Sequence, residues 1–159
     1  MSERASVTAT VEVAVDPTTA FEVFTDDIGA WYKRGPYSFK DPTRALGVRF
    51  EPRVGGRFLE VHDAATGEGI EWGRVLVWEP GVRLVFSDLL SSAPPAPVTE
   101  VEVRFTPVAG GTRVTLEHRG LDRLPSEVAD QKRKHGWITL LGWFDEHFAS
   151  TREGATWRS

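Results

Sequence analysis

Three polar side chains stand at interior positions of alternating, strand-like segments of this sequence. His118, Thr99 and Asp88 are each separated from apolar residues by intervals of two. Successive side chains of a strand point to opposite faces, so these three are expected to face the protein interior with their apolar neighbours. A buried carboxylate beside an imidazole can perform acid–base chemistry or orient a small ligand.

Three further polar residues are assigned to the interior by the same alternation. Glu60 and His62 lie in residues 56–62, and Arg74 lies in residues 70–79. A one-residue bulge in either segment would invert its assignment. With these positions, the sequence predicts six polar groups projecting into a mostly aromatic interior.

Two interpretations of this polar set stay open. Buried polar groups are usually paired, so the set can be a satisfied structural network. A few polar groups in an apolar pocket also fix the orientation of small ligands. For an enzyme, the catalytic candidates are Glu60, Asp88 and His118, because burial raises the pKa of a carboxyl group and a neighbouring carboxylate holds an imidazole cationic.

Other kinds of chemistry have little support in the sequence. The chain contains no Cys and no Gly-x-Ser-x-Gly, so it lacks these signatures of a nucleophile. Potential zinc ligands such as His62 and His118 lie in separate segments without an HExxH motif, so no metal is expected. Nucleotide-binding glycine motifs are also missing, and no cofactor is expected.

The composition describes one ordinary globular domain over residues 1–159. Nineteen Lys and Arg against 23 Asp and Glu give a net charge of −4, which argues against nucleic-acid or anionic-membrane binding. No segment approaches the ~18 apolar residues of a membrane span, so membrane insertion is not expected. The start lacks a signal-peptide pattern and the chain lacks Cys, so a cytoplasmic location is predicted.

Hydrophobic periodicity predicts strands followed by one long helix. A core over residues 7–149 is expected, with a polar tail over residues 150–159. The expected elements are a strand at 6–15, short helices at 16–25 and 26–32, strands at 47–51, 56–62, 70–79, 82–89, 98–106 and 112–120, and a helix at 126–148. The predicted fold is therefore α+β: a curved antiparallel sheet of six or seven strands, two short helices, and a long C-terminal helix over the concave face.

Several short motifs, in this order and spacing, resemble a known family. They are Val15-Asp16-Pro17-Thr18-Thr19-Ala20-Phe21-Glu22-Val23-Phe24, Trp31, Glu51-Pro52-Arg53-Val54-Gly55-Gly56-Arg57-Phe58, Trp72-Gly73-Arg74, Glu79-Pro80-Gly81, Thr99 to Phe105, Gly111 to Leu121, and Gly136-Trp137. Residues 7–149 are similar to the START/Bet v 1-like (SRPBCC) superfamily, in particular to bacterial homologues of the activator of Hsp90 ATPase. The resemblance implies a helix-grip fold with an internal pocket, used by relatives for lipids, hormones, polyketide intermediates or a chaperone partner.

The leading functional hypothesis is non-catalytic binding of a small hydrophobic or aromatic ligand between the sheet and the C-terminal helix. The expected ligand contacts are Trp72, Arg74, Phe86, Thr99, His118, Leu141 and Phe144. A first alternative is an aromatase/cyclase-like or hydrolytic enzyme that uses Glu60 and His118 in the same cavity. A second is a co-chaperone-like module that binds a protein through its surface. A homodimer through the sheet edge is also possible.

Overall fold

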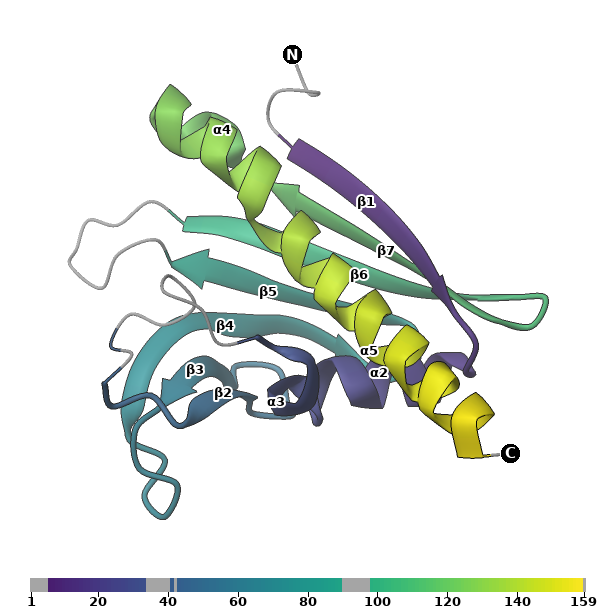
Figure 1. Ribbon diagram of the computed structural model, residues 1–159. Coiled ribbons are helices and arrows are strands. Elements are labelled where there is room, and N and C mark those ends of the chain that lie inside the picture. Colours follow the sequence, from purple (N-terminus) through teal and green to yellow (C-terminus); the bar gives the residue numbers. More distant parts are fainter. Residues whose placement is uncertain (1–5, 34–40, 42, 90–97, 159) are drawn as a thin grey trace.

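The computed structural model describes residues 6–33, 41, 43–89 and 98–158. A curved seven-stranded antiparallel sheet has its helices on one side (Figure 1), as the sequence predicts. In chain order the elements are β1 (Ser6–Val13), α2 (Pro17–Thr25), α3 (Ile28–Trp31), β2 (Gly47–Phe50), β3 (Arg57–Val61), β4 (Gly69–Glu79), β5 (Arg83–Leu89), β6 (Val98–Val108), β7 (Gly111–Arg119), the 3₁₀ helix η1 (Leu121–Arg123), α4 (Ser126–His135) and α5 (Trp137–Arg158).

Short connections between antiparallel neighbours produce the sheet. Its strand order is β1-β7-β6-β5-β4-β3-β2, so every strand from β2 to β6 lies beside the next one in the sequence. Gly81 and Gly110, in two of the turns, have φ angles of 76° and 82°. Glycine adopts this left-handed conformation without the steric cost of a side chain, which favours tight turns at these positions.

The first helix begins where the sequence predicts a cap. The side chain of Asp16 accepts a hydrogen bond from the backbone N–H of Thr19 at 3.1 Å, and Pro17 follows in the first turn. Phe21 and Phe24 then lie on the same side of α2, and both are buried. Their rings lie 5.3 and 6.1 Å from the ring of Phe105, so α2 is packed against β6.

The long C-terminal helix of the prediction is divided in two. A bend at Gly136 separates α4 from α5, because glycine favours the helical conformation less than other residues do. Beyond the bend, α5 crosses the concave face of the sheet (Figure 1) and buries Trp137, Leu141 and Phe144 against it. The helix also continues to Arg158, so the backbone of residues 150–158 is helical where a polar tail was expected.

Two irregularities change the alternation of β4, one in its pairing with β3 and one in its pairing with β5. Phe58 of β3 pairs with Gly73, and the next residue, Leu59, pairs with Glu71. Trp72 is therefore an extra residue on β4. An extra residue inverts the facing of the side chains that follow it, relative to a regular strand. Toward β5, Val75 pairs with Phe86 and Val77 with Val85, so Leu76 is a second extra residue, and the two irregularities together decide which side chains of β4 reach the interior.

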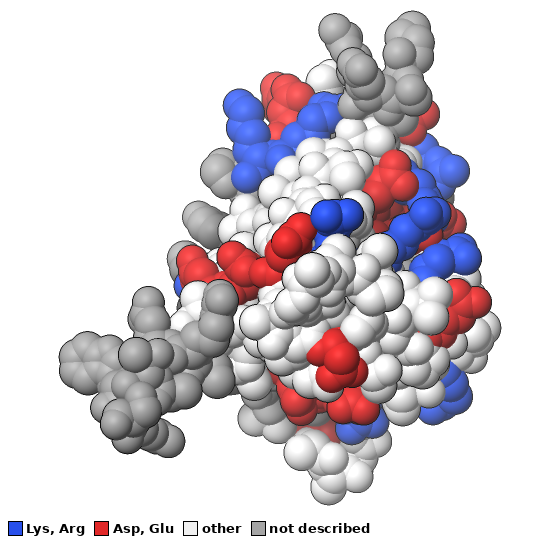
Figure 2. Space-filling model, turned by 90° about the vertical axis from the view of Figure 1, so that its right-hand side faces the viewer, with Lys and Arg blue, Asp and Glu red and all other residues white. Residues whose placement is uncertain are grey.

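Mixed charge characterises the face that Figure 2 shows. Lys and Arg side chains are interspersed there with Asp and Glu, with uncharged atoms between them (Figure 2). Within the described residues, no helix is long and apolar enough to cross a membrane.

Candidate functional site

Polar groups from three strands and a helix meet at one end of the sheet. Asp88 is near the end of β5, Thr99 near the start of β6, His118 near the end of β7, and Trp137 begins α5. Antiparallel pairing brings these strand termini to the same end of the sheet, and Asp88 pairs directly with Thr99. The sequence prediction that Thr99 and His118 point inward is confirmed, because both are fully buried.

Hydrogen bonds connect these side chains. The Thr99 hydroxyl oxygen lies 2.7 Å from Nε2 of His118, and Nε1 of Trp137 donates to Oδ2 of Asp88 at 3.3 Å. The same Oδ2 lies 3.9 Å from Nε2 of His118, which is longer than a hydrogen bond. The side chain of Asp88 retains 13% of its exposure, so this carboxylate stands at the boundary between the core and solvent.

Aromatic rings surround this polar cluster on the core side. The ring of Trp137 lies 5.0 Å from that of Phe86 and 5.7 Å from that of Phe58. The ring of Phe58 also lies 5.4 Å from that of Trp72. These separations are typical of packed aromatic pairs, so the site combines apolar walls with a small polar end.

Tyr32, at the end of α3, is a member of the site that sequence reasoning missed. Its ring lies 5.9 Å from Trp72 and 5.5 Å from Trp143. Burial raises the pKa of the Tyr32 hydroxyl above its ordinary value, and the negative charges of Asp88 and Glu60 raise it further. Sequence reasoning missed Tyr32 because periodicity carries no information about which tertiary neighbours meet.

Glu60 points inward as predicted, but its histidine partner is not the expected one. The side chain is fully buried, and its Oε2 lies 2.6 Å from Nε2 of His62 and 3.0 Å from the backbone N–H of Asp41. The predicted enzyme pair combined Glu60 with His118. In the structure, Glu60 contacts His62, whereas His118 lies near Asp88.

A polar pocket opens beside the Glu60 and His62 pair. Its volume is about 410 Å³, and His62, Arg44 and Arg57 are among the residues that line it. Arg57, the first residue of β3, is paired with Glu51, to whose carboxylate it donates hydrogen bonds of 3.1 and 2.9 Å. Two such bonds fix the guanidinium of Arg57 against Glu51 at the wall of the pocket.

The predicted inward position of Arg74 is wrong. After the bulge at Trp72, Val75 points into the core and is 1% exposed, whereas the side chain of Arg74 is 53% exposed. On the outside, Arg74 donates hydrogen bonds of 2.9 and 2.8 Å to Glu71. Arg74 therefore lies outside the interior in which we expected it to contact a ligand.

The other expected contact residues lie within the core. They are Trp72, Phe86, Thr99, His118, Leu141 and Phe144, all 9% exposed or less. Whether they touch a ligand stays a prediction. Pockets lined by described residues lie elsewhere: beside His62, between η1 and α4, and at the turn between β6 and β7. Among the described residues, no group of three His, Cys, Asp or Glu is placed to hold a metal ion.

Comparisons with known proteins agree with this architecture. Residues 14–149 match the sequence profile of a family described as Activator of Hsp90 ATPase homolog 1-like protein. NE0264 from Nitrosomonas europaea has a TM-score of 0.67 and 20% identity, over 96% of this chain and 99% of that chain. CalU16 from Micromonospora echinospora has a TM-score of 0.60 and 19% identity, over 93% of this chain and 78% of that chain.

A further similar structure belongs to a biosynthetic locus. DynU16, a protein of the dynemicin biosynthetic locus, has a TM-score of 0.64 and 21% identity, over 92% of this chain and 48% of that chain. At these identities the three structures show a shared fold. Among curated protein sequences, none matches this chain significantly.

Proposed function

Because the chain belongs to the family of activator of Hsp90 ATPase homolog 1-like proteins, we propose that it binds a small hydrophobic or aromatic molecule between the sheet and α5. Proteins with this fold commonly bind small hydrophobic molecules. The observation that carries the proposal is the group of Asp88, Thr99, His118 and Trp137 at the edge of an aromatic interior. We call this group the inner polar cluster.

The arrangement of the inner polar cluster supports binding rather than packing alone. Burying a polar group away from water is unfavourable unless it has partners, and these four groups are paired by hydrogen bonds, Thr99 with His118 and Trp137 with Asp88. Oδ2 of Asp88 and Nε2 of His118 are 3.9 Å apart, beyond hydrogen-bond length, and the side chain of Asp88 is 13% exposed, so the cluster meets solvent at this carboxylate. Aromatic walls with a few polar groups are typical of small-molecule sites.

The proposed contacts follow from this placement. They are Trp72, Phe86, Thr99, His118, Leu141 and Phe144 from the sequence prediction, with Tyr32, Asp88 and Trp137 added by the structure. The aromatic and aliphatic members supply apolar surface, and the polar members fix the orientation of the ligand.

Native mass spectrometry of protein purified without detergent tests the proposal. The expected result is a stoichiometric small molecule, which extraction then identifies by chemical class. A clean ligand-free mass, combined with no thermal stabilisation by a panel of hydrophobic and aromatic compounds, would overturn the proposal.

A pair of adjacent substitutions tests the location of the site. His118 and Glu117 are neighbours on β7, but His118 is fully buried whereas the side chain of Glu117 is 39% exposed and contacts Arg119. With 2-naphthol as probe and tryptophan fluorescence as readout, His118→Gln is expected to weaken binding at least tenfold and Glu117→Gln to leave it unchanged. Denaturation curves of both variants separate lost binding from lost folding. Equal effects of the two substitutions would place the site elsewhere.

Catalysis is the second candidate function, and the nearness of His118 to Asp88 favours it. A carboxylate can hold an imidazole in position for proton transfer, and the similar structure DynU16 comes from a biosynthetic locus. This hypothesis now assigns Asp88 rather than Glu60 as the partner of His118. It predicts turnover of the identified ligand that disappears in Asp88→Asn while ligand binding persists.

Four other expectations remain proposals of lower rank. A co-chaperone-like role predicts capture of a protein partner by a chain whose interior takes no ligand. A cytoplasmic location and a single domain over residues 1–159 are tested by cell fractionation and by limited proteolysis. A homodimer through the sheet edge is tested by analytical ultracentrifugation.

A further inference from the structure

A small apolar cluster, formed by residues of η1, of α4 and of the turn between them, lies apart from the main core. Leu121, Leu124 and Ala129 are 0%, 8% and 4% exposed, and Val7 and Val128 pack against them. These residues form a cluster separate from the one that contains the aromatic interior. The cluster packs η1 against α4, and the slightly exposed edges of Leu124 and Ala129 leave a small apolar surface.

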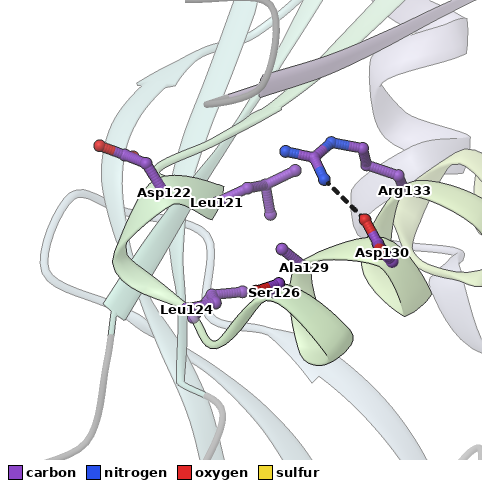
Figure 3. A pocket seen from close by; sticks show the side chains of 7 residues that line it. All are labelled: Leu121, Asp122, Leu124, Ser126, Ala129, Asp130 and Arg133. Atoms are coloured by element: carbon purple, nitrogen blue, oxygen red, sulfur yellow. Dashed lines mark hydrogen bonds and ion pairs between the residues drawn. The ribbon is translucent and has the colours of Figure 1, made fainter. Parts of the chain in front are cut away.

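This surface forms the floor of a pocket of about 720 Å³ between η1 and α4, which we call the α4 pocket (Figure 3). Leu121, Leu124 and Ala129 contribute the apolar lining, and the remaining lining residues are Asp122, Ser126, Asp130 and Arg133. An apolar floor with a few polar groups at its rim is the general form of a small-ligand site.

Arg133 gives the α4 pocket a cationic side. Its side chain extends from α4 toward Leu121 (Figure 3) and is only 28% exposed. Nη1 donates to Oδ1 of Asp130 at 3.1 Å, and within the described part of the chain Arg133 makes no other hydrogen bond. A guanidinium has five N–H donors in a planar fork, so most of its donors remain available to an acceptor in the pocket.

The contact with Asp130 is easily replaced. The side chain of Asp130 is 66% exposed, and exposed ion pairs contribute little because water screens them. The other acidic residue of the rim, Asp122, points away from the pocket (Figure 3). An anion that enters therefore competes mainly with Asp130 for Arg133.

We propose that the α4 pocket binds a free aliphatic carboxylic acid. The carboxylate pairs with the guanidinium of Arg133, whose fork matches carboxylate geometry, and the aliphatic tail lies against the exposed edges of Leu124 and Ala129. Both parts of the ligand are needed. A carboxylate without the tail would make only a partly exposed ion pair with Arg133, which water weakens. A tail without the carboxylate would not pair with the guanidinium. This site is independent of the function proposed for the interior.

Octanoate is the probe, and two-dimensional NMR of the labelled protein is the readout. Octanoate is expected to shift amide signals of residues 121–133 in a saturable way. Acetate, which lacks the tail, and 1-octanol, which lacks the charge, are expected to bind at least tenfold more weakly.

Substitutions of opposite expected sign make the test specific. Arg133→Gln is expected to weaken octanoate binding at least tenfold. Asp130→Asn removes the competing carboxylate and is expected to strengthen binding severalfold. Arg123→Gln is the matched control, because Arg123 lies on η1 and donates to the backbone oxygen of Val98. It is expected to leave the affinity unchanged.

Three results would overturn the proposal. They are an absence of saturable shifts, an octanoate affinity that is unaffected by Arg133→Gln, or weaker binding in Asp130→Asn. A leucine-terminated peptide that binds more tightly than octanoate, with the same dependence on Arg133, would overturn the choice of a free acid. His118→Gln is expected to leave octanoate binding unchanged, so failure of this proposal and failure of the interior site are distinguishable.

Discussion

Two carboxylates on opposite faces of the same sheet have very different surroundings. Glu102, on the outer face of β6, is 5% exposed and lies within 2.8 Å of guanidinium nitrogens of Arg83, Arg104 and Arg119. Asp88, on the inner side, receives a hydrogen bond from Trp137. The outer carboxylate is thus matched by formal positive charge, whereas the inner one stands among aromatic rings and hydrogen-bond donors.

The difference shows how the two faces are divided between stability and function. Burial alone would raise the pKa of Glu102, but hydrogen bonds from Arg119 and Arg104 outweigh it and hold that pKa below its ordinary value. The charged form of Glu102 is therefore a stabilising part of the folded state. The inner polar cluster has no comparable set of arginines among the residues described here, which suits a surface that must accept a ligand.

The largest expected effect comes from removing Glu102, the carboxylate that three arginines share on the outer face of the sheet. Glu102→Ala leaves three arginines without their shared carboxylate, and we expect the free energy of unfolding to fall by about 2 kcal/mol. Urea denaturation measures it. Arg113→Ala, which breaks the exposed pair with Glu12, is the control and is expected to cost under about 1 kcal/mol. Similar small losses in both variants would remove the contrast between the two faces.

The pH dependence of the free energy of unfolding tests whether the charged carboxylate of Glu51, paired with Arg57, stabilises the fold. Hydrogen bonds from the side chain and backbone of Arg57 lower the pKa of Glu51 to about 2 from its ordinary value of 4.5. Because the folded-state pKa is the lower one, the charge contributes stability above pH 4.5, and this contribution is lost as the pH falls toward 2. At pH 7 we expect Glu51→Gln to be less stable than the parent by about 1.5 kcal/mol.

The difference between Glu51→Gln and the parent protein is expected to shrink between pH 4.5 and pH 2 in chemical denaturation. A difference that stays constant over this range would show that the substitution acts through packing rather than charge.

On the inner face, removal of one hydroxyl is expected to act mainly on binding. Thr99→Val deletes the group that lies 2.7 Å from Nε2 of His118 while keeping the shape of the side chain. We expect a stability loss of about 1 kcal/mol, as for one buried hydrogen bond, and a clear loss of affinity for the interior probe. Thermal unfolding and fluorescence titration measure the two quantities. A stability loss as large as that of Glu102→Ala would indicate a mainly structural role for the inner polar cluster.

The smallest expected effect comes from a substitution outside both the inner polar cluster and the group formed by Glu102 and its arginines. It serves as a reference for the other changes in stability. A Cβ built on Gly142 of α5 meets no atom within 4 Å. Gly142→Ala is therefore expected to stabilise the helix, by up to about 1 kcal/mol. A rise in the thermal midpoint checks this expectation. A fall would mean that α5 needs a glycine here for a reason other than space.

The sequence predicted the fold well because most of its strands obey simple periodicity. The alternation around Thr99, Val101 and Val103 follows one pleated surface, and the structure confirms it. Glu102, between Val101 and Val103, points to the opposite face as alternation requires, but it is covered by arginines from β5, β6 and β7. Side-chain facing is a local property of a strand, whereas burial depends on its neighbours.

The errors at the candidate site have the same physical origin. Arg74 was misplaced because a bulge of one residue carries no reliable signal in a single strand. The pairing of Glu60 with His62, and the approach of Tyr32 to Asp88 and Glu60, depend on contacts between separate elements. Such contacts are set by sheet register and helix packing, which alternation alone does not specify.

The bend at Gly136 has a consequence for cooperativity. The backbone N–H groups of Thr139 and Leu140 both donate to the Gly136 carbonyl, at 3.0 and 3.4 Å, so Gly136 stands at the start of a new helix, separate from α4. A helix divided in this way can open in two steps, and the segment with less buried surface opens first. Amide hydrogens of α4 should therefore exchange with solvent faster than those of the buried half of α5, while the sheet stays closed.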